Sequence, residues 1–196
     1  MSKVLPTIFG IDYKVSFSEK GYQDLNIQLR NNYSAIFILV DTNTQKYCLP
    51  HFLDKIEVLI DKHVIRIGPG EINKHLETCK QVWNKLSDLG ADKKSLMINL
   101  GGGVVCDLGG FVAAAFKRGI HFINVPTTLL SMVDASVGGK TGVDFEGLKN
   151  QIGIITNPEL VIIDPIFLKT LPENEYRSGY AEMLKHGIIK DGEYFK

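Results

Sequence analysis

One stretch of the sequence concentrates cationic, hydroxyl and amide side chains among glycines. Of the 19 glycines in the chain, 11 lie between Gly101 and Gly153. Glycine lets the backbone turn with positive φ or approach a ligand closely, while lysine, arginine and hydroxyl groups donate to anionic oxygens. The stretch is typical of a site for a phosphorylated, polyoxygenated ligand, although a solvated surface hairpin is the simpler interpretation of any single lysine. Its polar residues include Arg118, Thr127, Thr128, Asp134, Lys140, Thr141, Lys149 and Asn150.

The segment LGGGVVCDLGG, residues 100–110, has three consecutive glycines directly after an apolar run. A strand that leads through glycines into a helix presents free backbone N–H groups and the positive end of the helix dipole, which suits a pyrophosphate. The segment is not a GxGxxG motif, because the third glycine falls on Cys106 and Asp107 comes too early for the ribose-binding acid. A tight turn from strand to helix, without a ligand, is the alternative interpretation.

The segment VGGKTG, residues 137–142, resembles part of a phosphate-binding P-loop. A P-loop requires glycine at the position that Asp134 occupies, and it opens a helix after a buried strand. We therefore exclude a P-loop here.

Near the end of the chain, Glu182, Lys185 and His186 have the spacing of residues that share one face of a helix. Glu182 and His186 could supply two ligands to a divalent metal, but metal sites usually have three or four. A solvated helix face is the simpler interpretation of this pair taken alone.

An alternation of strands and helices would position these groups. Unbroken apolar runs are typical of strands buried on both faces, and apolar residues at steps of three and four indicate amphipathic helices. We expect an open α/β fold, a Rossmann-like mostly parallel sheet flanked by helices, with ligands at the carboxyl ends of its strands. The predicted strands are 35–41, 63–67, 95–100, 121–125 and 160–164, and the predicted helices are 71–90, 104–116 and a segment from Pro172 onward.

The composition argues against several classes of protein. Lysine and arginine number 22, as do aspartate and glutamate, so the formal net charge is zero, and no global basic field attracts nucleic acid or an anionic membrane. The apolar runs 35–40 and 111–116 are far shorter than the roughly 20 residues of a membrane span. The first residues lack a signal-peptide pattern, which indicates a cytoplasmic location. The three scattered cysteines form neither a disulfide framework nor a CxxC site.

Four segments of the sequence read GGGVVCDLGGFVAAAFKRGIHFINVPTTLLSMVDASVGGKTGVD, LKNQIG, DPIFLKTLP and GYAEMLKHGII. Together they resemble the 3-dehydroquinate synthase family. The similarity is strong from about Leu100 to Ile189 and colinear over essentially the whole chain. Iron-dependent polyol dehydrogenases share the glycine turn and PTT but lack VDASVGGKTG. Sugar-phosphate cyclases that make valiolone- or inosose-type rings share much of the pattern and remain an alternative.

The resemblance implies an NAD-dependent, homodimeric enzyme that also uses a divalent metal, zinc or cobalt. Its substrate would be a phosphorylated seven-carbon keto acid, 3-deoxy-D-arabino-heptulosonate 7-phosphate, which is cyclised to 3-dehydroquinate in the shikimate pathway. The implied order is transient oxidation of a ring alcohol, elimination of phosphate, re-reduction, ring opening and aldol closure. Oxidation acidifies the adjacent C–H bond so that phosphate can leave, and the substrate phosphate itself would act as the base.

The resemblance also implies roles for individual residues. Residues matching cofactor contacts are Asp41, Glu71, Lys74, Gly102, Gly103, Val104, Asp107, Thr127, Thr128, Leu130, Lys140, Lys149 and Thr170. Residues matching substrate contacts are Arg118, Asp134, Lys140, Asn150 and Lys185, of which Asp134, Lys140 and Lys185 would also be catalytic. Glu182 matches the family's metal-binding glutamate, whereas His186 matches no ligand and is expected to lie behind the ligands or be incidental.

The family's other metal ligands, two histidines, lie in a C-terminal helical domain of which this chain has almost none. We therefore expect an NAD-binding α/β domain at 1–171 and the start of an incomplete metal- and substrate-binding domain at 172–196. Glu182 alone could not form a zinc site, so such a fragment would bind NAD weakly and lack full activity. A stand-alone nucleotide-binding module is the alternative from another functional class.

Overall fold

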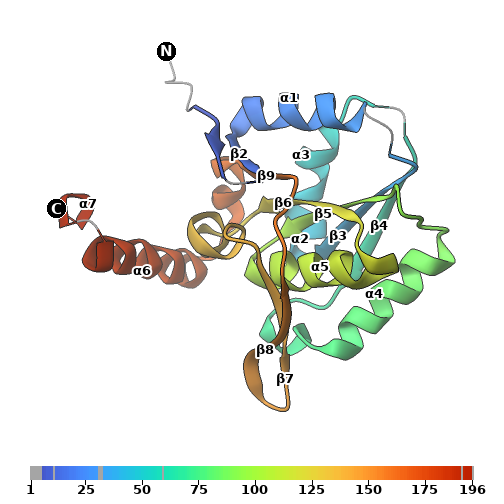
Figure 1. The fold of residues 1–196 in the computed structure, drawn as a ribbon. Helices are drawn as coiled ribbons and strands as arrows, with labels where there is room; N and C mark the ends of the chain where they lie inside the picture. The colour runs from blue at the N-terminus through green and yellow to red at the C-terminus, as the bar shows by residue number, and fades with distance from the viewer. Residues whose placement is uncertain (1–5, 11, 31–32, 59, 191, 196) are drawn as a thin grey trace.

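A seven-stranded sheet forms the centre of the molecule (Figure 1). The computed structural model describes residues 6–10, 12–30, 33–58, 60–190 and 192–195. The strand order is β1-β2-β9-β6-β5-β3-β4, and only the β1–β2 pair is antiparallel. The predicted mostly parallel α/β sheet is therefore confirmed. The strands are β1 (Ile8–Phe9), β2 (Lys14–Phe17), β3 (Ile36–Asp41), β4 (Lys62–Ile67), β5 (Leu96–Gly101), β6 (His121–Pro126) and β9 (Leu160–Ile163).

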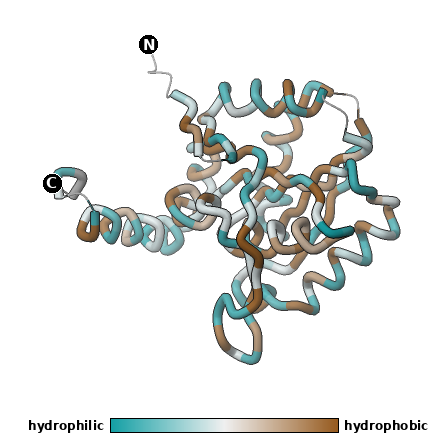
Figure 2. Tube along the Cα trace, viewed as in Figure 1, coloured by the Kyte–Doolittle hydropathy of each residue, from teal (hydrophilic) through white to brown (hydrophobic). Residues whose placement is uncertain are grey.

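Helices cover both faces of the sheet, because alternate residues of the central strands point to opposite sides. In β3, Ile36 and Ile38 face the core that includes α1 and α3, whereas Phe37 and Leu39 face the core that includes α4 and α5. In the tube view, apolar positions follow the central strands (Figure 2). The helices are α1 (Ser18–Leu29), α2 (Thr42–Tyr47), α3 (Leu49–Asp54), α4 (Leu76–Asp88) and α5 (Gly103–Ala115).

The last third of the chain adds elements outside the sheet. β7 (Lys140–Phe145) and β8 (Leu148–Ile155) form an antiparallel hairpin, and a π-helix, η3 (Ser131–Ala135), connects β6 to it. After β9 come a 3-10 helix, η4 (Pro165–Thr170), then α6 (Glu173–Lys190) and α7 (Gly192–Phe195).

Helix α6 projects from the body of the molecule (Figure 1). It contacts the body through Gly179, where an added Cβ would lie 2.5 Å from the Cβ of Leu129. Ile188 and Ile189, nearer the far end, are 70% and 73% exposed. None of the described helices is both long and apolar enough to cross a lipid bilayer.

The helix expected from Glu71 begins at Leu76 instead. A 3-10 turn, η1 (Glu71–Asn73), comes first, and Lys74 has the non-helical angles φ −85° and ψ 64°. The side chain of His75 then caps α4 by accepting a hydrogen bond from the Thr78 backbone N–H. Ile72, an apolar residue within the helix expected over 71–90, is 84% exposed as a result.

Two consecutive buried hydrogen bonds link strands of the sheet beside α5. The Asn99 Nδ2 donates to Asn124 Oδ1 at 2.9 Å, and the Asn124 Nδ2 donates to the carbonyl of Ser136 at 3.2 Å. These two hydrogen bonds therefore link β5 and β6 to the segment that follows η3. Gly109 of α5 packs on the Asn99 amide so closely that an added Cβ would lie 2.0 Å from Oδ1.

The substitution Gly109→Ala is expected to destabilise the protein by about 1–3 kcal/mol, because overpacking outweighs the better helix propensity of alanine. Denaturant unfolding monitored by circular dichroism measures this difference. Gly192→Ala is the control, since its Cβ would meet nothing within 4 Å, and should change the free energy of unfolding by less than about 0.5 kcal/mol. Equal stability of the two variants would contradict the close packing.

All three cysteines are buried thiols. Burial raises the pKa of Cys48 to about 11 and that of Cys79 to about 12, and it also raises the pKa of Cys106. Because the thiolate is the reactive form, we expect Ellman's reagent to modify the native protein slowly at about pH 8. All three should react rapidly in denaturant. Fast, stoichiometric labelling of the native protein would contradict this expectation.

Candidate functional site

Two adjoining cavities lie at the carboxyl edge of the sheet, where parallel α/β folds bind ligands. The larger has a volume of about 670 Å³ and the smaller about 450 Å³. Asp107 and Ala135 line both cavities. The two sites suggested by the sequence are therefore neighbours that share part of their walls.

The larger cavity collects the residues expected to contact the cofactor, with Lys140 as the exception. They come from the end of β3, from the glycine turn and the first turns of α5, from the segment after β6, from η1 and the residue that follows it, from the hairpin and from η4. These lining residues are Asp41, Glu71, Lys74, Gly102, Gly103, Val104, Asp107, Thr127, Thr128, Leu130, Lys149 and Thr170.

The glycine turn leads from β5 into α5. Gly102 is the N-cap residue of α5, and no side chain caps the helix. The first backbone N–H groups of such a helix remain free to bind an anion. An added Cβ at Gly102 would lie 3.0 Å from Thr128 Cγ2, so a larger side chain would crowd the turn between two strand ends.

Asp41 closes β3 and starts α2. Its Oδ1 accepts hydrogen bonds from the backbone N–H groups of Asn43 and Thr44, both at 2.8 Å, and the Thr44 hydroxyl accepts from the Asp41 backbone N–H at 2.9 Å. This capping box fixes the carboxylate at the rim of the larger cavity. Within the described part of the chain, its second oxygen has no hydrogen-bond partner.

The smaller cavity contains three of the five residues expected to bind substrate, Asp134, Lys140 and Asn150. Lys140 Nζ lies 3.6 Å from Asp134 Oδ1 in a solvent-exposed ion pair, which a ligand can replace at little cost. Arg118 precedes β6 and lies at the opposite, amino-terminal edge of the sheet, so it lines neither cavity. Lys185 on α6 also lines neither cavity.

Lys74 lies between the two cavities as a buried cation. Its side chain is 5% exposed, and Nζ donates to Asp107 Oδ2 and to Asn150 Oδ1, both at 2.6 Å. Burial raises the pKa of Asp107, although the Lys74 ammonium opposes that shift. The Lys74 side chain thus joins Asp107, an expected cofactor contact, to Asn150, an expected substrate contact.

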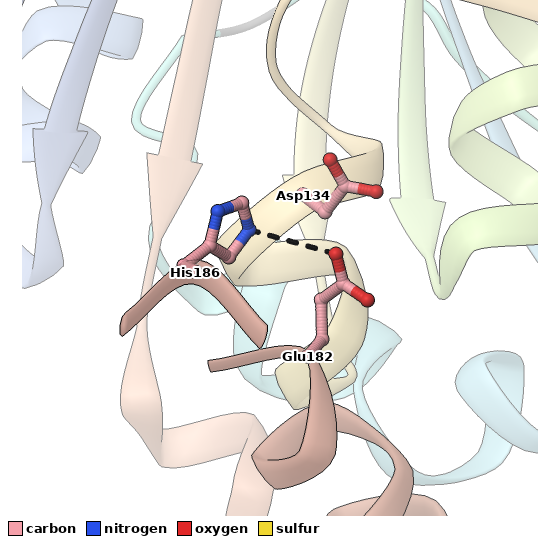
Figure 3. Close-up of side chains that lie close together, drawn as sticks. All are labelled: Asp134, Glu182 and His186. Carbon is pink, nitrogen blue, oxygen red and sulfur yellow. Dashed lines mark ion pairs between the residues drawn. The ribbon is translucent and has the colours of Figure 1, made fainter. Parts of the chain in front are cut away.

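Asp134, Glu182 and His186 meet where η3 faces α6 (Figure 3). One ligand atom from each lies within 4.8 Å of the others, and His186 Nε2 is 3.5 Å from Glu182 Oε1. Lys185 also pairs with Glu182, and this contact raises the pKa of Lys185. The spacing on α6 brought Glu182 and His186 together as expected, whereas nothing in the sequence pattern showed Asp134 as the third member.

Some lining residues of the larger cavity were not predicted from the sequence. They lie on α2 or around η4 and the start of α6, and include Asn43, Thr44, Tyr47, Cys48, Phe167, Asn174 and Glu175. A signal existed for α2, because aspartate after an apolar strand with threonine three residues later has the pattern of a helix cap. No comparable pattern marks the residues around η4.

Comparisons with known proteins identify the family of this chain. Residues 62–178 match the family model described as 3-dehydroquinate synthase N-terminal. The 3-dehydroquinate synthase of Parabacteroides distasonis is 45% identical over 178 residues, 88% of this chain and 50% of that protein. The enzyme of the same name from Acetivibrio thermocellus is 47% identical over 163 residues, 81% of this chain and 44% of that protein. The chain spans about half the length of the curated relatives it matches.

Two solved structures that contain NAD+ and a divalent metal ion have a similar fold. The 2-epi-5-epi-valiolone synthase from Streptomyces hygroscopicus, with NAD+ and Zn2+ bound, has a TM-score of 0.82 and 30% identity over 96% of this chain and 53% of its own. A 2-deoxy-scyllo-inosose synthase complexed with carbaglucose-6-phosphate, NAD+ and Co2+ has a TM-score of 0.83 and 25% identity over 90% of this chain and 49% of its own. The family model covers more than half of this chain. This chain therefore belongs to the 3-dehydroquinate synthase family.

Proposed function

We propose that this chain provides the NAD-binding part, and one wall of the substrate site, of a 3-dehydroquinate synthase. The proposed enzyme is a carbon–oxygen lyase that converts 3-deoxy-D-arabino-heptulosonate 7-phosphate into 3-dehydroquinate and phosphate. The observation that carries the proposal is the junction of two cavities that share Asp107, one lined by the glycine turn and the other by Asp134, Lys140 and Asn150.

Sequence identity favours this activity over the two related ones. The curated relatives named 3-dehydroquinate synthase are 42–47% identical to this chain over most of its length. The structures of valiolone and inosose synthases are 30% and 25% identical. A stand-alone nucleotide-binding module is less well supported, because it would need neither the smaller cavity nor Glu182 beside Asp134.

The larger cavity has the donors and acceptors that NAD requires. The uncapped start of α5 offers backbone N–H groups to a pyrophosphate, and the carboxylates of Asp41 and Asp107 can accept from ribose hydroxyls. NAD, when bound, supplies the reversible oxidation of a substrate alcohol. Lys149 Nζ pairs with Glu71 Oε1 at 3.2 Å and closes this cavity on the hairpin side.

The smaller cavity suits a substrate that carries hydroxyl and phosphate groups. The ammonium of Lys140 would bind an anionic oxygen and stabilise charge on a departing phosphate. Asp134 would accept from a substrate hydroxyl and thereby orient the ring, and Asn150 would add a polar contact. In this proposal the leaving phosphate takes the proton from carbon, as the resemblance implies, while the protein residues hold the substrate in place.

The cluster of Asp134, Glu182 and His186 fits a divalent metal in the chemistry of its donors, since zinc accepts carboxylate oxygen and imidazole nitrogen. We propose Glu182 as the metal ligand, with Asp134 and His186 within reach of the same ion. A bound metal would polarise a substrate oxygen. The homodimer, the cytoplasmic location and the domain boundary at residue 172 remain predictions.

NADH should bind saturably to this chain, and Gly102→Val should weaken the binding by at least about tenfold. A branched side chain there would collide with Thr128 and fill the space beside the first N–H groups of α5. Titration of NADH fluorescence measures the affinity, with Gly192→Val as the control that has open space at its Cβ. Absence of saturable binding to the wild-type chain would contradict the assignment of the larger cavity.

Zinc affinity should fall by about tenfold or more in Glu182→Gln, because an amide oxygen is a much weaker zinc ligand than a carboxylate. Equilibrium dialysis with elemental analysis measures bound zinc in the wild-type and variant chains. Glu173→Gln, on the same helix and paired with Arg177, is the control and should retain wild-type affinity. If Glu182→Gln bound as much zinc as the wild type, the proposed ligand would be wrong.

A further inference from the structure

Among the described residues, Lys74 is the one buried lysine. The non-helical turn between η1 and α4 directs it inward, and its carbonyl accepts a hydrogen bond from the Asp144 backbone N–H of the hairpin at 2.9 Å. A buried ammonium is tolerated when it is paired and hydrogen-bonded. Lys74 meets that condition with two partners, Asp107, which lines both cavities, and Asn150, which lines the smaller one.

The ammonium fixes the orientation of the Asn150 amide. A lysine ammonium has donors and no acceptor, so the amide oxygen of Asn150 must face Nζ and the amide Nδ2 must point away from it. The backbone holds the residue in place, because the Asn150 N–H donates to Asp144 Oδ1 at 2.8 Å and φ is +53°. Nδ2 has no hydrogen-bond partner among the described residues, and Asn150 lines the smaller cavity.

The same ammonium also binds Asp107, whose other oxygen is an acceptor and not a donor. Oδ2 accepts from Lys74, and within the described part of the chain Oδ1 has no hydrogen-bond partner and is left as an acceptor. The charged groups that influence this carboxylate are Lys74, Glu71 and Lys140. Burial raises the pKa of Asp107, and Lys74 is the largest opposing influence, so loss of this cation would raise the pKa further.

We propose that Lys74 is a positioning residue that determines whether a hydrogen-bond donor or an acceptor faces each cavity. It holds Asn150 with its N–H donors toward the smaller cavity and holds Asp107 as an acceptor toward the larger. The proposal rests on the proposed function, because it assigns the larger cavity to the cofactor and the smaller to an anionic substrate group. It changes the role of Lys74 from a direct cofactor contact to a residue that orients two others.

The test compares Lys74→Met with Lys74→Arg, which retains the charge, and with Lys80→Met, which removes an exposed lysine from α4. NADH affinity is measured by fluorescence from about pH 8.5 to about pH 6. In Lys74→Met, NADH affinity should begin to fall at a higher pH than in the wild-type chain, because without the cation Asp107 gains a proton more readily and ceases to be a pure acceptor. The wild-type chain, Lys74→Arg and Lys80→Met should show a much smaller change over the same range.

Inorganic phosphate is the probe of the smaller cavity. The Asn150 side-chain amide signals in a ¹H–¹⁵N spectrum, assigned by their loss in Asn150→Asp, should shift when phosphate binds to the wild-type chain and to Lys74→Arg. In Lys74→Met the amide can turn over, so the shift should be lost and phosphate affinity should fall by about tenfold. Asn150→Asp keeps an acceptor for Lys74 but removes the donor, so it should weaken phosphate binding more than NADH binding.

The outcomes separate this proposal from the proposed function. If the wild-type chain bound neither NADH nor phosphate, the proposed function would fail first. If it bound both, and Lys74→Met kept the wild-type pH profile and phosphate shift, the positioning role would be overturned. If Lys74→Met did not fold, Asn150→Asp would decide, and equal losses of NADH and phosphate affinity would count against the proposal.

Discussion

The arrangement of the whole site follows from the burial of the central strands on both faces. In β3 and β5, residues pointing to either side are enclosed by helices, so there is almost no room within the sheet for groups that must meet water or a ligand. The polar residues that line the larger cavity therefore lie mainly at or just beyond the carboxyl ends of the central strands. Asp41, the glycine turn and the threonines after β6 are brought together for this reason, although they come from separate parts of the sequence.

The second cavity depends on a different interaction, because the β7–β8 hairpin lies outside the sheet. It is joined to the segment before α4 by the Lys74–Asn150 hydrogen bond, the Lys149–Glu71 ion pair and the bond from the Asp144 N–H to the Lys74 carbonyl. Of these, the hydrogen bond of Lys74 joins a buried ammonium, 5% exposed, to the neutral side-chain amide of the exposed Asn150. The hairpin also packs on α5 through the buried Val143, so Lys74 adds a polar contact to an apolar one in positioning Lys140 and Asn150.

The sequence was most informative where a single physical rule dominated. Unbroken apolar runs located the central strands, and three consecutive glycines located the strand-to-helix turn, because burial and close approach leave clear patterns. For the segment from Glu71 to His75, the periodicity predicted a helix that the structure does not have. Ile72 and Leu76 have helical spacing, but the non-helical backbone at Lys74 separates them. The contact between Lys74 and Asn150 joins residues 76 positions apart, and no local pattern records it. The resemblance supplied the residue roles, and the fold gathers most of them into two cavities.

The hairpin also has a practical use as a reporter. Its tip is Gly147, where an added Cβ would meet nothing within 4 Å and φ is +76°. Asn150, three residues further along, lies at the wall of the smaller cavity. A residue that tolerates both the open space and the left-handed backbone, such as asparagine, would be accepted at the tip with little disturbance. A spectroscopic label at the tip would therefore lie three residues from the wall of the smaller cavity and outside both cavities.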